Sequence, residues 1–71
     1  MSPEREIPIR GDGIRLGQLL KLAGVADSGA EAKELLEAGG VRVNGEPEAR
    51  RGRQLARGDV VTVAGEQLRV G

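Results

Sequence analysis

The segment from Ser28 to Gly45, SGAEAKELLEAGGVRVNG, constrains the fold most, because it encodes a helix, a strand and a tight turn in one short run. Ser28 followed three residues later by Glu31 predicts a capping box, in which the serine oxygen accepts a first-turn N–H group and the glutamate accepts the N–H group of the serine. Ala32, Leu35 and Leu36 then recur at i, i+3 and i+4, which makes one face apolar. We therefore expect an amphipathic helix that begins at Ser28.

The second half of this segment predicts where the helix ends and how the chain turns back. Gly39 and Gly40 supply the positive φ angle that terminates a helix at low steric cost. The residues 41–43, VRV, alternate with period two, which is typical of a strand. Asn44 and Gly45 then predict a type I′ hairpin turn, since both central residues of that turn need a positive φ angle.

The residues before Ser28 predict a short strand and a first helix. Glu6 to Arg10 is expected to form a strand at a sheet edge, because Pro8 lacks an N–H group for a central ladder. A turn at residues 11–13 follows, with Asp12 as a candidate cap. Leu16 to Ala23 carries apolar side chains at i, i+3, i+4 and i+7, which predicts a helix. The short connection to the second helix predicts a compact helix corner.

The residues after the predicted turn alternate between polar loop and strand patterns. Residues 50–54, RRGRQ, show neither helical nor strand periodicity and are expected to form an exposed loop. Val60 to Val63 and Gln67 to Val70 are expected to pair as a second hairpin around Gly65 and Glu66. Because the helices precede most of the strands, we expect residues 1–71 to form a single α+β domain.

The composition excludes most catalytic and metal chemistry. The chain of 71 residues has no cysteine, histidine or tyrosine, so the usual nucleophile–base pairs and soft metal ligands cannot be assembled. We expect no enzyme activity, no metal and no cofactor. No apolar run approaches the length of a membrane span, and the absence of cysteine gives no reason to expect an oxidising compartment. A cytoplasmic location and no membrane partner are therefore expected.

The charges are balanced in number but not in distribution. Eleven basic and eleven acidic residues give a net charge of zero, yet five arginines and only two acidic residues lie between Arg42 and Arg57. A guanidinium presents a rigid fork that matches two phosphate oxygens. An ordinary solubilising loop explains such a charge run equally well, so charge alone leaves both interpretations open.

The order of the motifs favours the phosphate interpretation. The chain has I-R-L at Ile14 to Leu16, S-G-x-x-A-K at Ser28 to Lys33, G-x-V-x-V-N-G ending at Gly45, then an arginine-rich loop, and G-D at Gly58 and Asp59. This order resembles the S4 RNA-binding domain, most closely its small stand-alone bacterial members, over about residues 14–63. The resemblance implies an αL-type fold, two packed helices against a small mostly antiparallel sheet. It also implies non-catalytic binding of structured RNA such as ribosomal RNA.

The resemblance also implies an RNA-facing surface. Carried over onto this sequence, that surface consists of Arg15, Lys21, Ser28, Lys33, Asn44, Arg50, Arg51 and Arg53. Structural roles compete for three of these: a helix cap for Ser28, a turn for Asn44 and an ion pair with Glu37 for Lys33. Two positions depart from the family, since Gly17 and Gly29 stand where many S4 domains carry aspartate and arginine. Gly17 is also expected to weaken the first helix by roughly 0.5–1 kcal/mol.

Composition narrows the kind of RNA. Sequence-tolerant binding of single strands uses aromatic stacking, and this chain has no aromatic residue. A-form helices are recognised through shape, phosphates and 2′-hydroxyls, so folded RNA, with the ribosome as a candidate partner, is the expected target of a monomeric protein. The competing hypothesis is a protein-interaction module that uses the same arginines to dock on an acidic or ribosomal protein. A sulfur-carrier-like domain is disfavoured, because Val70-Gly71 lacks a Gly-Gly end.

Overall fold

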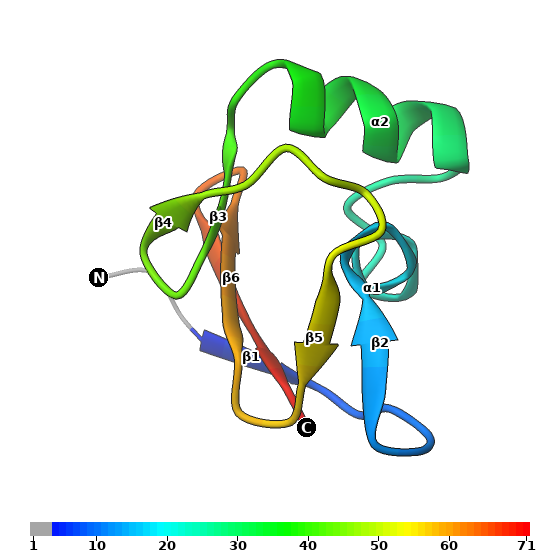
Figure 1. Ribbon diagram of the computed structural model, residues 1–71, viewed down its shortest axis with the longest axis vertical. Helices are drawn as coiled ribbons and strands as arrows, with labels where there is room; N and C mark the ends of the chain where they lie inside the picture. The colour runs from blue at the N-terminus through cyan, green and yellow to red at the C-terminus, as the bar shows by residue number, and fades with distance from the viewer. Residues whose placement is uncertain (1–3) are drawn as a thin grey trace.

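The computed structural model describes residues 4–71, in which two helices pack against a small sheet (Figure 1). The elements in chain order are β1 (Glu4–Ile7), β2 (Gly13–Arg15), α1 (Leu16–Leu22), α2 (Gly29–Glu37), β3 (Val41–Val43), β4 (Glu46–Pro47), β5 (Gln54–Ala56), β6 (Val60–Val63) and β7 (Glu66–Val70). The expected domain range of 1–71 includes three residues, 1–3, that lie outside the described part. The α+β class predicted from the order of helices and strands is confirmed.

Helix α1 forms where its leucine stripe predicted it. Leu16, Leu19 and Leu20 are fully buried. The helix ends at Leu22 and is followed by the cap residue Ala23, whose N–H group donates to the Leu19 carbonyl. The chain then reverses at Gly24, which has a φ angle of 77°. The suggestion that Asp12 caps this helix is wrong, because β2 intervenes and Arg15 occupies the cap position. A guanidinium has no acceptor atom, so the carbonyl oxygens of residues 51 and 53 accept N–H groups of the first turn instead.

Helix α2 begins at the predicted cap, with one correction to the capping box. The Ser28 hydroxyl accepts a hydrogen bond from the Glu31 N–H group at 3.2 Å, as expected. The Glu31 carboxylate, however, accepts from the N–H group of Asp27 at 2.6 Å rather than from Ser28. The reciprocal bond therefore reaches one residue further back. Ala32 and Leu36 are buried against the rest of the core.

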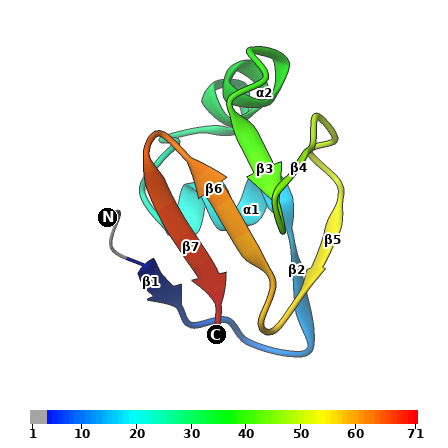
Figure 2. The same cartoon turned by 90° about the vertical axis from the view of Figure 1, so that its left-hand side faces the viewer.

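The main sheet has the strand order β1-β7-β6-β3-β4 and covers one side of α1 (Figure 2). All neighbouring pairs are antiparallel except β1 and β7, which confirms the prediction of a mostly antiparallel sheet. The first strand lies at the sheet edge as predicted, but it spans Glu4–Ile7 rather than Glu6 to Arg10. It stops directly before Pro8, since proline has no N–H group to continue the ladder.

The two hairpin turns have the backbone geometry that their residues favour. Asn44 and Gly45 have φ angles of 51° and 85°, which confirms the predicted turn between β3 and β4. The turn between β6 and β7 lies at Ala64 and Gly65, one residue earlier than predicted, with φ angles of 51° and 77°. Ala64 thus adopts a left-handed backbone conformation that the local sequence does not predict.

A second, two-stranded sheet pairs β2 with β5 and was missed by sequence reasoning. Ile14 pairs with Leu55, and Leu55 is buried while Ile14 packs at the margin of the core. Residue 54, expected in an exposed loop, is the first residue of β5. Unlike VRV at 41–43, the sequences GIR and QLA show no apolar alternation, and each strand's partner lies about forty positions away in the sequence.

The core consists of leucine, isoleucine, valine and alanine side chains, and no polar or charged residue is buried within residues 4–71. Leu22 differs from the other leucines of α1, because 56% of its surface is exposed.

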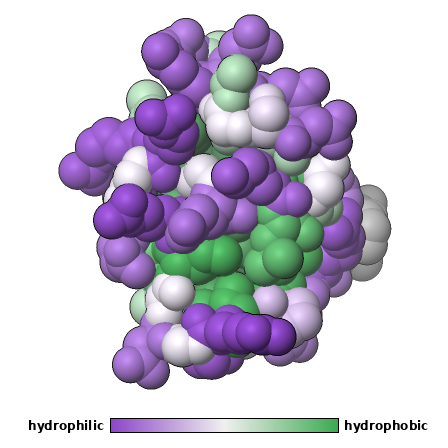
Figure 3. All heavy atoms as spheres, turned by 90° about the vertical axis from the view of Figure 1, so that its right-hand side faces the viewer, coloured by the Kyte–Doolittle hydropathy of each residue, from purple (hydrophilic) through white to green (hydrophobic). Residues whose placement is uncertain are grey.

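Apolar side chains are visible on one face of the molecule, where hydrophilic side chains surround them (Figure 3). Among the described residues, no helix is long and apolar enough to cross a membrane.

Candidate nucleic-acid interface

A groove with a volume of about 350 Å³ lies between α1, the start of α2 and residues 48–53, which we call the arginine loop. Its lining contains three basic side chains, a glutamine and small residues, but no acidic side chain; the basic ones are Arg15, Lys21 and Arg51. We call this hollow the cationic groove. It joins three cations that lie up to 36 positions apart in the chain.

Helix α1 supplies one wall of the cationic groove through its spacing. Gln18 and Lys21 lie three residues apart on one face of the helix, and Arg15, the cap residue before it, lines the same groove. Leu16, Leu19 and Leu20 occupy the opposite, buried face. The amphipathic pattern that directs leucine into the core therefore also aligns these polar side chains along the groove.

The arginine loop supplies the opposite wall and is joined to α1 by its backbone. The N–H groups of Leu16 and Gly17 donate to the carbonyl oxygens of Arg53 and Arg51, each at 2.9 Å. These bonds satisfy N–H groups in the first turn of α1, which have no partner inside the helix. The loop is thus part of the cap of α1, and its course is tied to the helix.

Gly17 lets Arg51 lie close to α1. A Cβ atom at position 17 would lie 2.5 Å from Cγ of Arg51, closer than any normal contact between carbon atoms. Glycine destabilises a helix by roughly 0.5–1 kcal/mol relative to alanine. At position 17, the missing Cβ atom leaves the space that the Arg51 side chain occupies. By contrast, a Cβ atom at Gly29 would meet nothing within 4 Å, so the groove is open at the start of α2.

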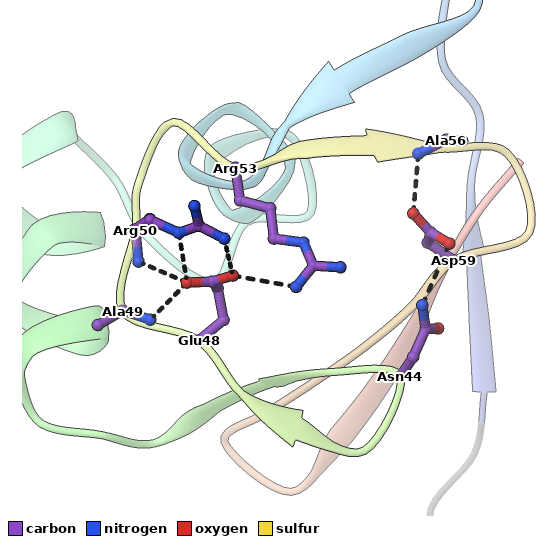
Figure 4. A network of polar contacts seen from close by, with 7 residues as sticks. All are labelled: Asn44, Glu48, Ala49, Arg50, Arg53, Ala56 and Asp59. Atoms are coloured by element: carbon purple, nitrogen blue, oxygen red, sulfur yellow. Dashed lines mark hydrogen bonds and ion pairs between the residues drawn. The ribbon is translucent and has the colours of Figure 1, made fainter.

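A single carboxylate organises the arginine loop (Figure 4). Glu48 accepts five hydrogen bonds: from the N–H groups of Ala49 and Arg50, from Nε and Nη2 of Arg50, and from Nη1 of Arg53. Its side chain is only 8% exposed, beneath an Arg50 side chain that is 77% exposed. The hydrogen bonds from Arg50 and Arg53 lower the pKa of Glu48 from 4.5 to about 2. The carboxylate is therefore ionised at neutral pH.

The five arginines between positions 42 and 57 differ in their partners. Arg42 donates to the Gly45 carbonyl, and Arg57 donates to the carbonyl groups of the chain segment before β2 and of the C-terminal residue. Arg50 and Arg53 are paired with Glu48. Within residues 4–71, the guanidinium of Arg51 has neither an acidic partner nor a hydrogen-bond acceptor. Arg15 and Lys21 likewise form no ion pair with an acidic side chain in the described part of the chain.

Lys33 lies beside the cationic groove rather than in it. It lines an adjoining hollow of about 210 Å³ together with Arg51. Nζ of Lys33 also lies 3.9 Å from a Glu37 oxygen, and both side chains are more than 60% exposed. Such exposed pairs contribute little to stability, so this contact leaves Lys33 available to an anion.

The side chains of the two remaining predicted residues, Ser28 and Asn44, form hydrogen bonds within the protein. Ser28 caps α2 through its hydroxyl group. The side chain of Asn44 donates to Asp59 at 3.2 Å and accepts from the Val60 N–H group at 2.9 Å. Asn44 lies at the end of β3 that points away from α2 (Figure 4). The structure therefore joins Arg15, Lys21 and Arg51, and separates Asn44 from them.

Three residues of this region were missed by sequence reasoning. Gln18 was detectable, because it lies on the same helical face as Lys21. Gly29 was noted only as a missing arginine, whereas it forms part of the groove wall. Glu48 carried no distinguishing sequence signal. In the described part of the chain, no cluster of three or more acidic residues is arranged to hold a metal ion.

The family model of the S4 domain matches residues 7–71. The chain belongs to the S4 domain family. This confirms the family inferred from the order of motifs. A Bacillus subtilis (strain 168) protein described as a probable ribosome maturation protein, RlbA, is 52% identical over 59 residues, which cover 83% of each chain. The Escherichia coli K12 protein YbcJ, described as a putative RNA-binding protein, is 39% identical over 57 residues, covering 80% of this chain and 81% of YbcJ.

Two further similarities involve longer proteins. The tyrosine–tRNA ligase of Nitrosomonas europaea is 48% identical over 44 residues, which are 62% of this chain and 11% of the ligase. The crystal structure of the 30S ribosomal protein S4e from Thermoplasma acidophilum matches with a TM-score of 0.67 and 26% identity, over 84% of this chain and 32% of that protein. The fold predicted for this S4 domain, two helices against a small mostly antiparallel sheet, is thereby confirmed.

Proposed function

We propose that this S4 domain binds folded RNA without catalysis, and that the cationic groove receives the phosphate groups. The observation that carries the proposal is the convergence of Arg15, Lys21 and Arg51 on a hollow that no acidic side chain lines. Cations that have no protein partner retain their full capacity for phosphate oxygens. Family membership and the names of the two small relatives support RNA binding in general.

The choice of RNA follows from composition and from the relatives. Because the chain has no aromatic residue to stack on unpaired bases, we propose a duplex or otherwise folded target. The description of the Bacillus subtilis relative as a ribosome maturation protein favours ribosomal RNA within that class. We further propose that the domain acts as a monomer, with Lys33, Arg50 and Arg53 bordering the bound RNA.

A salt titration tests the phosphate mechanism. Binding of a fluorescently labelled RNA hairpin is measured by anisotropy between roughly 50 and 300 mM KCl, a range in which counterion release dominates the affinity. Three groove contacts are expected to give a slope of log affinity against log salt of about −3, since each duplex phosphate contributes about −0.9. Replacing Arg51 with alanine is expected to reduce this slope by about one unit.

The control is a single-stranded homopolymer of equal length at matched salt. It is expected to bind more weakly than the hairpin, because the protein has no stacking platform. A slope near zero for the hairpin would contradict the phosphate mechanism. Tighter binding of the single strand would contradict recognition of folded RNA. Binding to ribosomal proteins that persists after nuclease treatment would favour the protein-interaction hypothesis instead.

A further inference from the structure

We propose that Glu48 is a positioning residue for RNA recognition, an acidic side chain whose role is to place Arg51 and Arg50 for phosphate binding. The proposal rests on the proposed function of the cationic groove. Glu48 bonds both ends of the arginine loop, since it accepts from the Ala49 and Arg50 N–H groups at one end and from Arg53 at the other. The loop between these anchors contains Arg51.

The anchored loop determines where Arg51 lies. The Arg53 N–H group donates to the Arg50 carbonyl at 3.3 Å, which closes a tight turn around Arg51 and Gly52. The carbonyl oxygens of Arg51 and Arg53 then accept the N–H groups of Gly17 and Leu16. With its backbone held in this way, Arg51 passes its side chain over Gly17 into the groove. Without the carboxylate, two side-chain guanidinium groups and two N–H groups lose their common acceptor.

Glu48 also hides its own charge from an approaching phosphate. A carboxylate offers about four lone-pair sites, and Glu48 already accepts five hydrogen bonds, so its acceptor capacity is filled. Its side chain is 8% exposed, whereas that of Arg50 is 77% exposed. Arg50 binds Glu48 through Nε and Nη2, and Nη1 has no acceptor among the residues that the structure describes. An RNA phosphate therefore meets the outer edge of Arg50 and not the carboxylate beneath it.

Positioning and simple electrostatics predict opposite effects when this negative charge is removed. If Glu48 acted only through its charge, Glu48→Gln would strengthen RNA binding, because one repulsive charge is lost. Positioning predicts weaker binding, because Arg51 and Arg50 lose their fixed placement. Glu46→Gln is the matched control, since Glu46 is an exposed residue of β4 and makes no side-chain hydrogen bond within residues 4–71.

The experiment measures the dissociation constant for a labelled RNA hairpin at one salt concentration. Glu46→Gln is expected to change it by about twofold or less, toward tighter binding. Glu48→Gln is expected to weaken binding by roughly three- to tenfold, the effect of losing one ordered hydrogen-bonding contact. Glu48→Asp keeps the net charge but shortens the side chain by one methylene group, and it is expected to weaken binding as well. Circular dichroism at the assay temperature identifies variants that are folded.

A double-mutant cycle separates positioning from general destabilisation. If Glu48 acts through Arg51, Glu48→Gln has a smaller effect on affinity when Arg51 is already alanine. An equal fold-change in both backgrounds would overturn the proposal, as would tighter binding by Glu48→Gln. If Glu48→Gln does not fold, parental affinity of folded Glu48→Asp would overturn it. If Arg51→Ala loses affinity for RNA but Glu48→Gln binds like the parent, the role of Glu48 is refuted and the groove remains the proposed binding site. If Arg51→Ala itself binds RNA like the parent, the proposed function of the groove is refuted.

Discussion

The cationic groove and the turn around Asn44 are two polar regions that the family resemblance implied to face RNA, and they differ in how their polar groups are used. At the turn, Asn44 bonds to Asp59 and Val60, and Asp59 also accepts the Ala56 N–H group at 2.9 Å. In the groove, Arg51 has no such partner in the described chain. Unused hydrogen-bonding capacity, rather than polarity, therefore distinguishes the candidate binding surface from the structural turn.

The largest effect is expected from reversing the charges of the groove. Replacing Arg15, Lys21 and Arg51 together with glutamate should weaken binding of a folded RNA by more than about 100-fold, because three charge-assisted contacts become repulsive. The fold should persist, since exposed charges contribute little to stability. Anisotropy titration and circular dichroism measure the two properties.

The control for this variant applies the same charge change elsewhere. Glutamate at Arg10, Arg42 and Arg69, which do not line the groove, should have a much smaller effect at about 0.15 M salt, where charges beyond roughly 8 Å are largely screened. Equal losses in the two triple variants would mean that net charge, and not the groove, governs RNA binding.

The turn should show the opposite behaviour. Asn44→Gly keeps the positive φ angle but removes the side-chain bonds to Asp59 and Val60. We expect the free energy of unfolding to fall by about 0.5–1.5 kcal/mol for each lost hydrogen bond, the typical net contribution, because both bonds are exposed to solvent. RNA affinity should stay at the parental value. Denaturant unfolding and the hairpin titration test this pair of expectations, and a loss of affinity in the folded variant would return Asn44 to the binding surface.

The two unusual glycines provide a finer comparison within the groove. Gly17→Ala should displace Arg51, because the new Cβ atom would lie 2.5 Å from its Cγ atom, and should weaken RNA binding by roughly two- to tenfold. Gly29→Ala has open space and should leave affinity unchanged. Both changes favour helix formation, so neither result follows from helix propensity. If both variants bind like the parent protein, close passage of Arg51 over Gly17 does not matter for binding.

An arginine at position 29, where many S4 domains carry one, tests whether bound phosphates reach the open end of the groove. Gly29→Arg places a fourth cation beside Lys21 without a steric clash at Cβ. The salt slope for a duplex RNA should steepen by about 0.9, the value for one added phosphate contact. An unchanged slope would indicate that the bound phosphates do not reach the start of α2.

The smallest effect concerns the acid stability of the arginine loop. The pKa of Glu48 is about 2 in the folded protein against an ordinary value of 4.5, so the ionised carboxylate stabilises the fold above about pH 4.5. This contribution is lost as the pH falls toward 2. The difference in melting temperature between the parent and Glu48→Gln should therefore be largest above about pH 5 and shrink in acid. A difference that grows as the pH falls would contradict the role of the ionised carboxylate.

Local elements were predictable because their causes lie within a few residues. The Ser28 cap, the leucine stripe of α1 and the turn at Asn44 and Gly45 depend on hydrogen bonds and spacings of at most a helical turn, and all three occur in the structure. The two predictions that were slightly wrong also concern neighbouring residues. Glu31 bonds one residue further back than expected, and the first strand stops at Pro8.

The helices, the hairpins, the apolar core and, through the order of motifs, the family could be read from local patterns in the chain. Which arginines pair with an acidic residue and which one lines the groove depends on contacts between distant parts of the folded chain. Arg50, Arg51 and Arg53 look equivalent along the chain, but the N–H groups of Leu16 and Gly17 hold the loop from more than thirty positions away. This long-range bonding, together with the acceptor capacity of Glu48, pairs two of the arginines and directs the third into the groove. No local sequence pattern predicts these hydrogen-bond partners, because they come together only when the chain folds.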